Sequence, residues 1–72
     1  MPKLPVLRPY QGITALEKGS FRQVFQRGSH VQLERGNLLV TVPVHPGDLN
    51  LQTLHSILRQ AQPTAEEFMV LL

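Results

Sequence analysis

Two glycine-led turns, Gly28-Ser29 and Gly36-Asn37, constrain the middle of this chain most strongly. Runs of alternating apolar and polar residues, with many aromatic and β-branched side chains, flank both turns. Turns this short join neighbouring strands that run in opposite directions. The sequence therefore predicts a three-stranded antiparallel meander, with strands at residues 21–27, 30–34 and 38–42.

Alternation assigns the strand side chains to the two faces of this sheet, because successive side chains in a strand point in opposite directions. One face carries Phe21, Phe25, Val31, Leu33, Leu38, Val40 and Val42. The other face carries Arg22, Gln26, His30, Gln32, Glu34, Leu39 and Thr41. We expect the first face to pack in the core and the second, which includes His30, to face water.

A helical pattern precedes the meander at residues 9–18. Pro9 suits the first turn of a helix, and Gly19 suits its end. Apolar residues recur every three positions at Tyr10, Ile13 and Leu16, as on one side of an amphipathic helix. Gly12 weakens this helix, since glycine inside a helix costs about 1 kcal/mol relative to alanine.

Two further helices are predicted after Pro43, Pro46 and Gly47, which end the sheet. Asp48 or Asn50 can cap the first of them. Its apolar residues are Leu51, Leu54, Ile57, Leu58 and Ala61, and Pro63 ends it. Thr64 and Glu67 have the spacing of a capping box, which opens a short terminal helix whose apolar residues are Phe68, Leu71 and Leu72. The predicted class is α+β, with the helices on one face of a three-stranded antiparallel sheet.

The composition indicates one small domain over residues 1–72, with residues 1–8 as an extended, proline-containing lead-in. Because there is no cysteine, packing or a partner must supply the stability. No apolar run reaches the roughly 20 residues of a membrane span, and the start is not typical of a signal peptide, so we expect a soluble cytoplasmic protein. The net charge is +2, and six of the seven Lys and Arg residues lie in the first half. This asymmetry is typical of a protein with a nucleic-acid partner and equally of a solvated charged surface.

Residues Arg27, Gly28, Ser29 and His30 bring together a cation, a flexible turn, a hydroxyl and an imidazole, a combination suited to a phosphate. Cleavage of RNA without a metal needs a base for the ribose 2′-OH proton, a cation for the phosphate and an acid for the leaving oxygen. His30 suits the base and Arg27 the cation, while Ser29 and the Gly28 and Ser29 amides can donate hydrogen bonds to phosphate oxygens. His45 is the candidate for a second acid or base; a local structural contact is its alternative role.

Other chemistry-bearing residues are assigned structural or surface roles. His55 lies among polar positions in the middle of a predicted helix, which is typical of the surface. The intervals between His30, His45 and His55 match no local ligand spacing, so no metal site is predicted. Tyr10, Phe21 and Phe25 either stack on bases or pack in the core, and their spacing favours the core.

Three blocks of this sequence resemble the HicA (YcfA-like) mRNA interferase toxins of type II toxin–antitoxin systems. The blocks are Arg27-Gly28-Ser29-His30, then Val40-Thr41-Val42-Pro43-Val44-His45, then residues 53–61 followed by Glu66-Glu67-Phe68. They occur in the family's order and cover nearly the whole chain from Tyr10 to Leu72. The chain departs from the family pattern at Gly12, where a larger residue is usual, at Leu51-Gln52 in place of a Pro-Gly pair, and at Gln62-Pro63 in place of a glycine.

The resemblance implies an αβββα fold like that of double-stranded-RNA-binding domains. It also implies cleavage of mRNA without a metal or other cofactor, a catalytic histidine at His30, and neutralisation by a HicB-type antitoxin. Two alternatives stay open from the residues: a non-catalytic RNA-binding module on the same fold, and a protein-interaction domain. The sequence does not give the oligomeric state.

Overall fold

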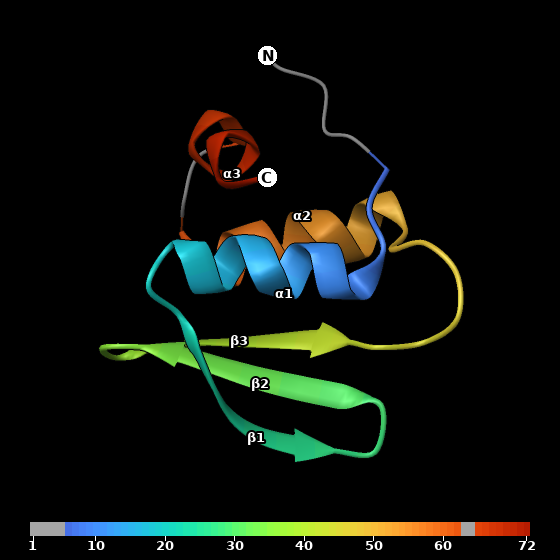
Figure 1. The fold of residues 1–72 in the computed structure, drawn as a ribbon, viewed down its shortest axis with the longest axis horizontal. Coiled ribbons are helices and arrows are strands. Elements are labelled where there is room, and N and C mark those ends of the chain that lie inside the picture. Colours follow the sequence, from blue (N-terminus) through green and yellow to red (C-terminus); the bar gives the residue numbers. More distant parts are fainter. Residues whose placement is uncertain (1–5, 63–64) are drawn as a thin grey trace.

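The computed structural model describes residues 6–62 and 65–72 and confirms the predicted α+β fold (Figure 1). Its elements are α1 (Pro9–Lys18), β1 (Arg22–Arg27), β2 (His30–Arg35), β3 (Leu38–Pro43), α2 (Leu51–Ala61) and α3 (Ala65–Leu71). Residues 1–5 of the predicted lead-in lie outside the described residues, as do Pro63 and Thr64, on which the predicted helix stop and capping box depend.

The three strands form an antiparallel sheet in the order β1-β2-β3. Across the first turn Arg27 pairs with His30, and across the second turn Arg35 pairs with Leu38. The predicted meander is therefore confirmed. In the pairing of β1 with β2 the register shifts between Gln23 and Phe25, which makes a β-bulge at Val24.

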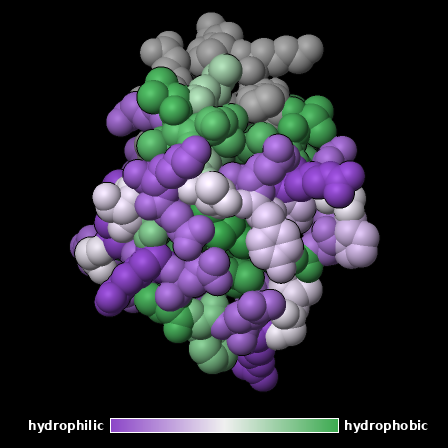
Figure 2. All heavy atoms as spheres, in the orientation of Figure 1, coloured by the Kyte–Doolittle hydropathy of each residue, from purple (hydrophilic) through white to green (hydrophobic). Residues whose placement is uncertain are grey.

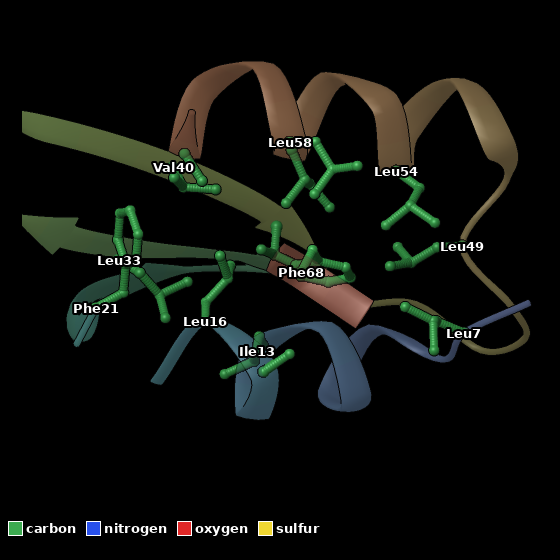
Figure 3. Packing of buried hydrophobic residues seen from close by; sticks show 14 of the residues in the cluster. Leu7, Ile13, Leu16, Phe21, Leu33, Val40, Leu49, Leu54, Leu58 and Phe68 are labelled. Atoms are coloured by element: carbon green, nitrogen blue, oxygen red, sulfur yellow. The ribbon is translucent and has the colours of Figure 1, made fainter. Parts of the chain in front are cut away.

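Helices α1 and α2 lie on one side of the sheet, and β1 lies farthest from them (Figure 1). The core fills the space between these layers and includes Phe68 from α3 (Figure 3). Its least exposed large members are Ile13, Leu16, Val31, Leu33, Val40, Val42, Leu54, Ile57 and Phe68. Helix α2 also covers the free edge of β3, because the Gln60 side-chain oxygen accepts a 3.0 Å hydrogen bond from the Thr41 amide. All six residues of β1 are exposed.

Polar side chains define the ends of the two longer helices. At the start of α1 the Arg8 amide donates to the Gln11 side-chain oxygen at 2.8 Å. Of the two capping candidates for α2, Asn50 is the cap, since its side-chain oxygen accepts from the Thr53 amide at 2.8 Å. Helix α2 ends at Ala61, and Gln62 then adopts the left-handed conformation with φ of 68°.

Two aromatic residues differ from the predicted core positions. Tyr10 is 63% exposed, because a spacing of three residues drifts around a helix of 3.6 residues per turn and leaves Tyr10 about 120° from Leu16. Phe25 is 55% exposed, because the bulge at Val24 places its side chain on the face of the sheet that lies opposite the core. Phe21 itself precedes β1 and is buried, as predicted.

The surface is divided between polar and apolar regions (Figure 2). Hydrophilic side chains cover the outer side of α1, and hydrophobic ones gather around α3. The exposed apolar residues at this end of the chain are Met69, Val70 and Leu72. Within residues 6–62 and 65–72, no helix combines the length and the apolar character needed to cross a membrane.

Candidate functional site

The turn between β1 and β2 holds two of the predicted site residues side by side. Arg27 and His30 are Cα partners, and Gly28 and Ser29 alone connect them. Gly28 has φ of 57°, a left-handed conformation that a residue with a side chain adopts only with strain. Gly28 thus allows a two-residue turn, which keeps the two functional side chains on the same face of the sheet.

This turn is tied to the loop that follows β3. The Ser29 carbonyl accepts a 2.5 Å hydrogen bond from the Val44 amide, one residue before His45. The Gln26 side chain donates to the Gly28 carbonyl at 3.3 Å from within the hairpin itself. Both contacts fix the backbone and leave the Ser29 hydroxyl and the exposed His30 ring facing outward.

A depression of about 370 Å³ lies on the outer face of the sheet, opposite the helices. Its lining residues come from all three strands and are Phe25, Arg27, His30, Gln32 and Thr41. The register explains this composition, because Gln32 pairs with Phe25 on one side and with Thr41 on the other. Since residues two apart in a strand share a face, His30 and Gln32 line the same depression. We call it the outer-face depression.

His30 and Arg27 are both exposed in the outer-face depression. Neither side chain makes a hydrogen bond or an ion pair with another residue of the part of the chain that the structure describes. Ring nitrogens and guanidinium N–H groups are strong hydrogen-bonding groups. Their full capacity is therefore directed to solvent or to a ligand at this position.

His45 lies in a different depression, of about 330 Å³, at the same end of the molecule. Its lining residues are Arg8, Pro9, Tyr10, Val44, His45, Pro46 and Gly47. The His45 Nδ1 lies 3.1 Å from the Pro46 carbonyl oxygen. A carbonyl only accepts hydrogen bonds, so this contact assigns the proton to Nδ1 and leaves Nε2 open. The structure thus does not bring His45 into the outer-face depression with His30.

The third histidine stands apart from both depressions. His55 is exposed on α2, as predicted. Among residues 6–62 and 65–72, His, Cys, Asp and Glu side chains form no group of three or more that could hold a metal ion.

Two of the five residues that line the outer-face depression, Arg27 and His30, are predictable as site residues from the sequence. Gln32 was assigned to the same face as His30, but no role was given to it. Thr41 approaches from β3, so only the register of the second hairpin could have revealed its position. Arg8 lines the depression around His45. The sequence points to Arg8 only through the excess of Lys and Arg residues in the first half of the chain.

A family model described as the HicA toxin of bacterial toxin–antitoxin systems matches residues 11–62. The chain belongs to the HicA toxin family. The match spans more than half of the chain, and it contains the Arg27–His30 turn, β3, His45 and the whole of α2. A search of curated proteins finds no match. This HicA-family chain is therefore a toxin of a toxin–antitoxin system, and its resemblance to that family is confirmed.

Proposed function

We propose that this HicA-family chain is an mRNA endoribonuclease whose catalytic residue is His30. The observation that carries the proposal is the pairing of exposed Arg27 and His30 across a two-residue turn, in one depression open to solvent. The family is known for mRNA interferases, which supports RNA as the substrate. The mRNA substrate and the absence of a membrane-spanning helix in the described residues favour the cytoplasm as the site of action.

His30 takes the proton from a ribose 2′-OH, and the resulting oxyanion attacks the adjacent phosphorus atom. The bond from phosphorus to the 5′-oxygen breaks, and the products are a 2′,3′-cyclic phosphate and a 5′-hydroxyl end. Imidazole is suited to this step because the unprotonated ring nitrogen of a neutral histidine can accept a proton. The Arg27 guanidinium stabilises the charge that grows on the phosphate. The Ser29 hydroxyl and the Gly28 and Ser29 amides are further donors for the phosphate oxygens.

The leaving 5′-oxygen also needs a proton, and the imidazolium form of His45, which carries a proton on Nε2 as well as on Nδ1, is the proposed acid. Its Nε2 is open, and the bond between the Val44 amide and the Ser29 carbonyl holds its loop against the turn that precedes His30. Because His45 lines a separate depression, the RNA backbone must pass over this end of the sheet to reach both rings. Replacing His45 with alanine then slows cleavage while His30-dependent activity persists.

The proposed partner is an antitoxin of the HicB type, since a toxin of a toxin–antitoxin system implies an antitoxin. Covering the outer-face depression is the direct way to inhibit the nuclease, because both Arg27 and His30 are exposed there. We expect RNA and the antitoxin to compete for this chain.

The test compares the His30→Ala variant with the wild-type chain and with His55→Ala, an exposed histidine on α2 that serves as the matched control. General acid–base groups contribute about 10²- to 10⁴-fold to rate. Purified His30→Ala should therefore cleave RNA at least about 100-fold more slowly, while His55→Ala cleaves normally. An RNA with 2′-deoxyribose at the cleaved position should resist the wild-type chain, because it lacks the attacking oxygen.

A non-catalytic RNA-binding module on the same fold is the competing function, and the separation of His45 from His30 favours it. It predicts salt-sensitive RNA binding without cleavage. Equal cleavage, or equal toxicity in growing cells, by the wild-type and His30→Ala chains would falsify the catalytic role of His30.

A further inference from the structure

Phe25 is a large apolar side chain that the core does not use. More than half of its surface is exposed, and the bulge at Val24 directs it to the face of the sheet opposite the helices. Burying a phenyl group contributes favourable free energy, which Phe25 largely forgoes in the free protein. The earlier residue Phe21, by contrast, is buried in the core.

The position of Phe25 relative to the proposed phosphate site is fixed by the hairpin. Phe25 pairs with Gln32, and the next pair on the same face toward the turn is Arg27 with His30. Two residues of a strand span about 7 Å. A phenyl ring therefore lies next to the cation and the imidazole, inside the same depression.

We propose that Phe25 stacks on a base of single-stranded RNA whose neighbouring phosphate lies against Arg27 and His30. The identity of that phosphate rests on the proposed function. The stacking itself concerns binding and substrate class rather than the chemical step. It assigns a specificity role to a residue that stands outside the catalytic machinery.

The remaining lining of the outer-face depression fits a nucleobase better than an apolar protein segment. The Gln32 and Thr41 side chains are half-buried beside Phe25 and make no hydrogen bond with another described residue. An amide and a hydroxyl can each donate and accept, as the edge of a base requires. An apolar partner would leave them buried and unpaired, which is costly. The depression is lined by a cation and by no carboxylate, which complements a nucleic acid.

The proposed contact requires a base whose face is accessible. In a duplex each base face is covered by its neighbours, whereas bases of loops and single strands can be splayed out onto aromatic side chains. The substrate class that follows is single-stranded RNA, or a loop within a folded transcript.

The chain contains no tryptophan, so a Phe25→Trp variant carries one fluorescent reporter at the proposed contact. This variant is combined with His30→Ala, so that a mixed-sequence RNA of twelve nucleotides stays intact during titration. We expect the RNA to quench the tryptophan strongly and the same RNA in a complementary duplex to leave it unchanged. Val70→Trp, at an exposed position on α3, is the control and should not be quenched.

Affinity and kinetics give a second measurement. Stacking of one base on an aromatic side chain is lost in Phe25→Ala and in Phe25→Leu, so both should bind the single strand between about 5-fold and 100-fold more weakly. Phe25→Trp should retain the affinity. In cleavage assays Phe25→Ala should raise KM with kcat nearly unchanged, since stacking contributes equally to the bound substrate and the transition state.

The outcomes separate this proposal from the proposed function. Quenching by single-stranded RNA in the His30→Ala background, together with no cleavage of RNA by the wild-type chain, supports the stacking and refutes the nuclease. Cleavage that depends on His30, with no quenching and with unchanged KM in Phe25→Ala, refutes the stacking alone. If Phe25→Ala keeps its RNA affinity but escapes the antitoxin, Phe25 is an antitoxin contact and the proposal is wrong.

Discussion

The two faces of the sheet are built from the same strands, yet they have opposite properties. On β2, Val31 and Leu33 are 1% and 0% exposed under the helices, whereas His30, which lies between them and the turn, is exposed on the other face. The inner face carries the apolar burial that stabilises the fold. The outer face carries the cation, the imidazole and the exposed phenyl group of the candidate site. Because successive side chains alternate between the two faces, the core residues and the candidate site residues are neighbours in the sequence but lie on opposite sides of the sheet.

The largest expected effect on stability belongs to the inner face. Leu33→Ala should lower the free energy of unfolding by about 2–5 kcal/mol, because it removes a buried side chain and leaves a cavity. The total free energy of unfolding of a small domain is only about 5–15 kcal/mol, so this loss would unfold a large fraction of the Leu33→Ala molecules. Chemical denaturation measures the change. The matched control is Leu39→Ala on the outer face, where the leucine is 49% exposed and the expected loss is below about 1 kcal/mol. Similar losses of unfolding free energy in Leu33→Ala and Leu39→Ala would contradict the proposed difference between the two faces of the sheet.

A smaller effect is expected from the helix layer that covers the inner face. Asn50→Ala removes the cap that accepts from the Thr53 amide, and it should lower stability by about 1 kcal/mol. Thermal unfolding measures this loss. The residue lies away from the outer-face depression, so RNA binding by the folded chain should stay the same. Altered RNA affinity at low temperature, where the variant is folded, would show that the helix layer contributes to the site.

The smallest effect is a gain in stability at Gly12. Gly12 is buried in α1, and an added Cβ would lie 3.5 Å from the Leu49 Cδ1 atom, an ordinary van der Waals contact. Gly12→Ala should therefore raise the unfolding free energy by about 0.5–1 kcal/mol through helix propensity alone. The denaturant concentrations at the unfolding midpoints of the wild-type and Gly12→Ala chains show whether the stability rises or falls. A loss of stability would mean that the contact with Leu49 is too tight, and a change in RNA affinity would contradict the separation of the two faces.

Local patterns were sufficient to predict most of the fold. The helix over residues 9–18 and the strands around the two glycine-led turns follow from spacing and turn chemistry alone, and so does the outward direction of His30. The position of Phe25 did not follow, because the bulge at Val24 depends on how β1 pairs with β2 rather than on the residues of β1. Tyr10 was misplaced because a three-residue repeat only approximates the turn of a helix.

The composition of the candidate site was predictable only in part, for the same reason. Arg27 and His30 are three positions apart in one motif, so their proximity could be predicted from the sequence alone. Thr41 joins them across β2, through a pairing of Gln32 with Thr41 that no short stretch reveals. Contacts across strands require the register, and the register is a property of the whole sheet.

The strict alternation along β2 has a consequence for how the toxin can fail. If β2 shifted by one residue relative to β1 and β3, Val31 and Leu33 would face water and His30 would face the helices. Such a chain would lose its core and its site in the same event. Every correctly packed molecule consequently displays the same imidazole on the same side of the sheet. The proposed antitoxin must therefore act on the folded protein.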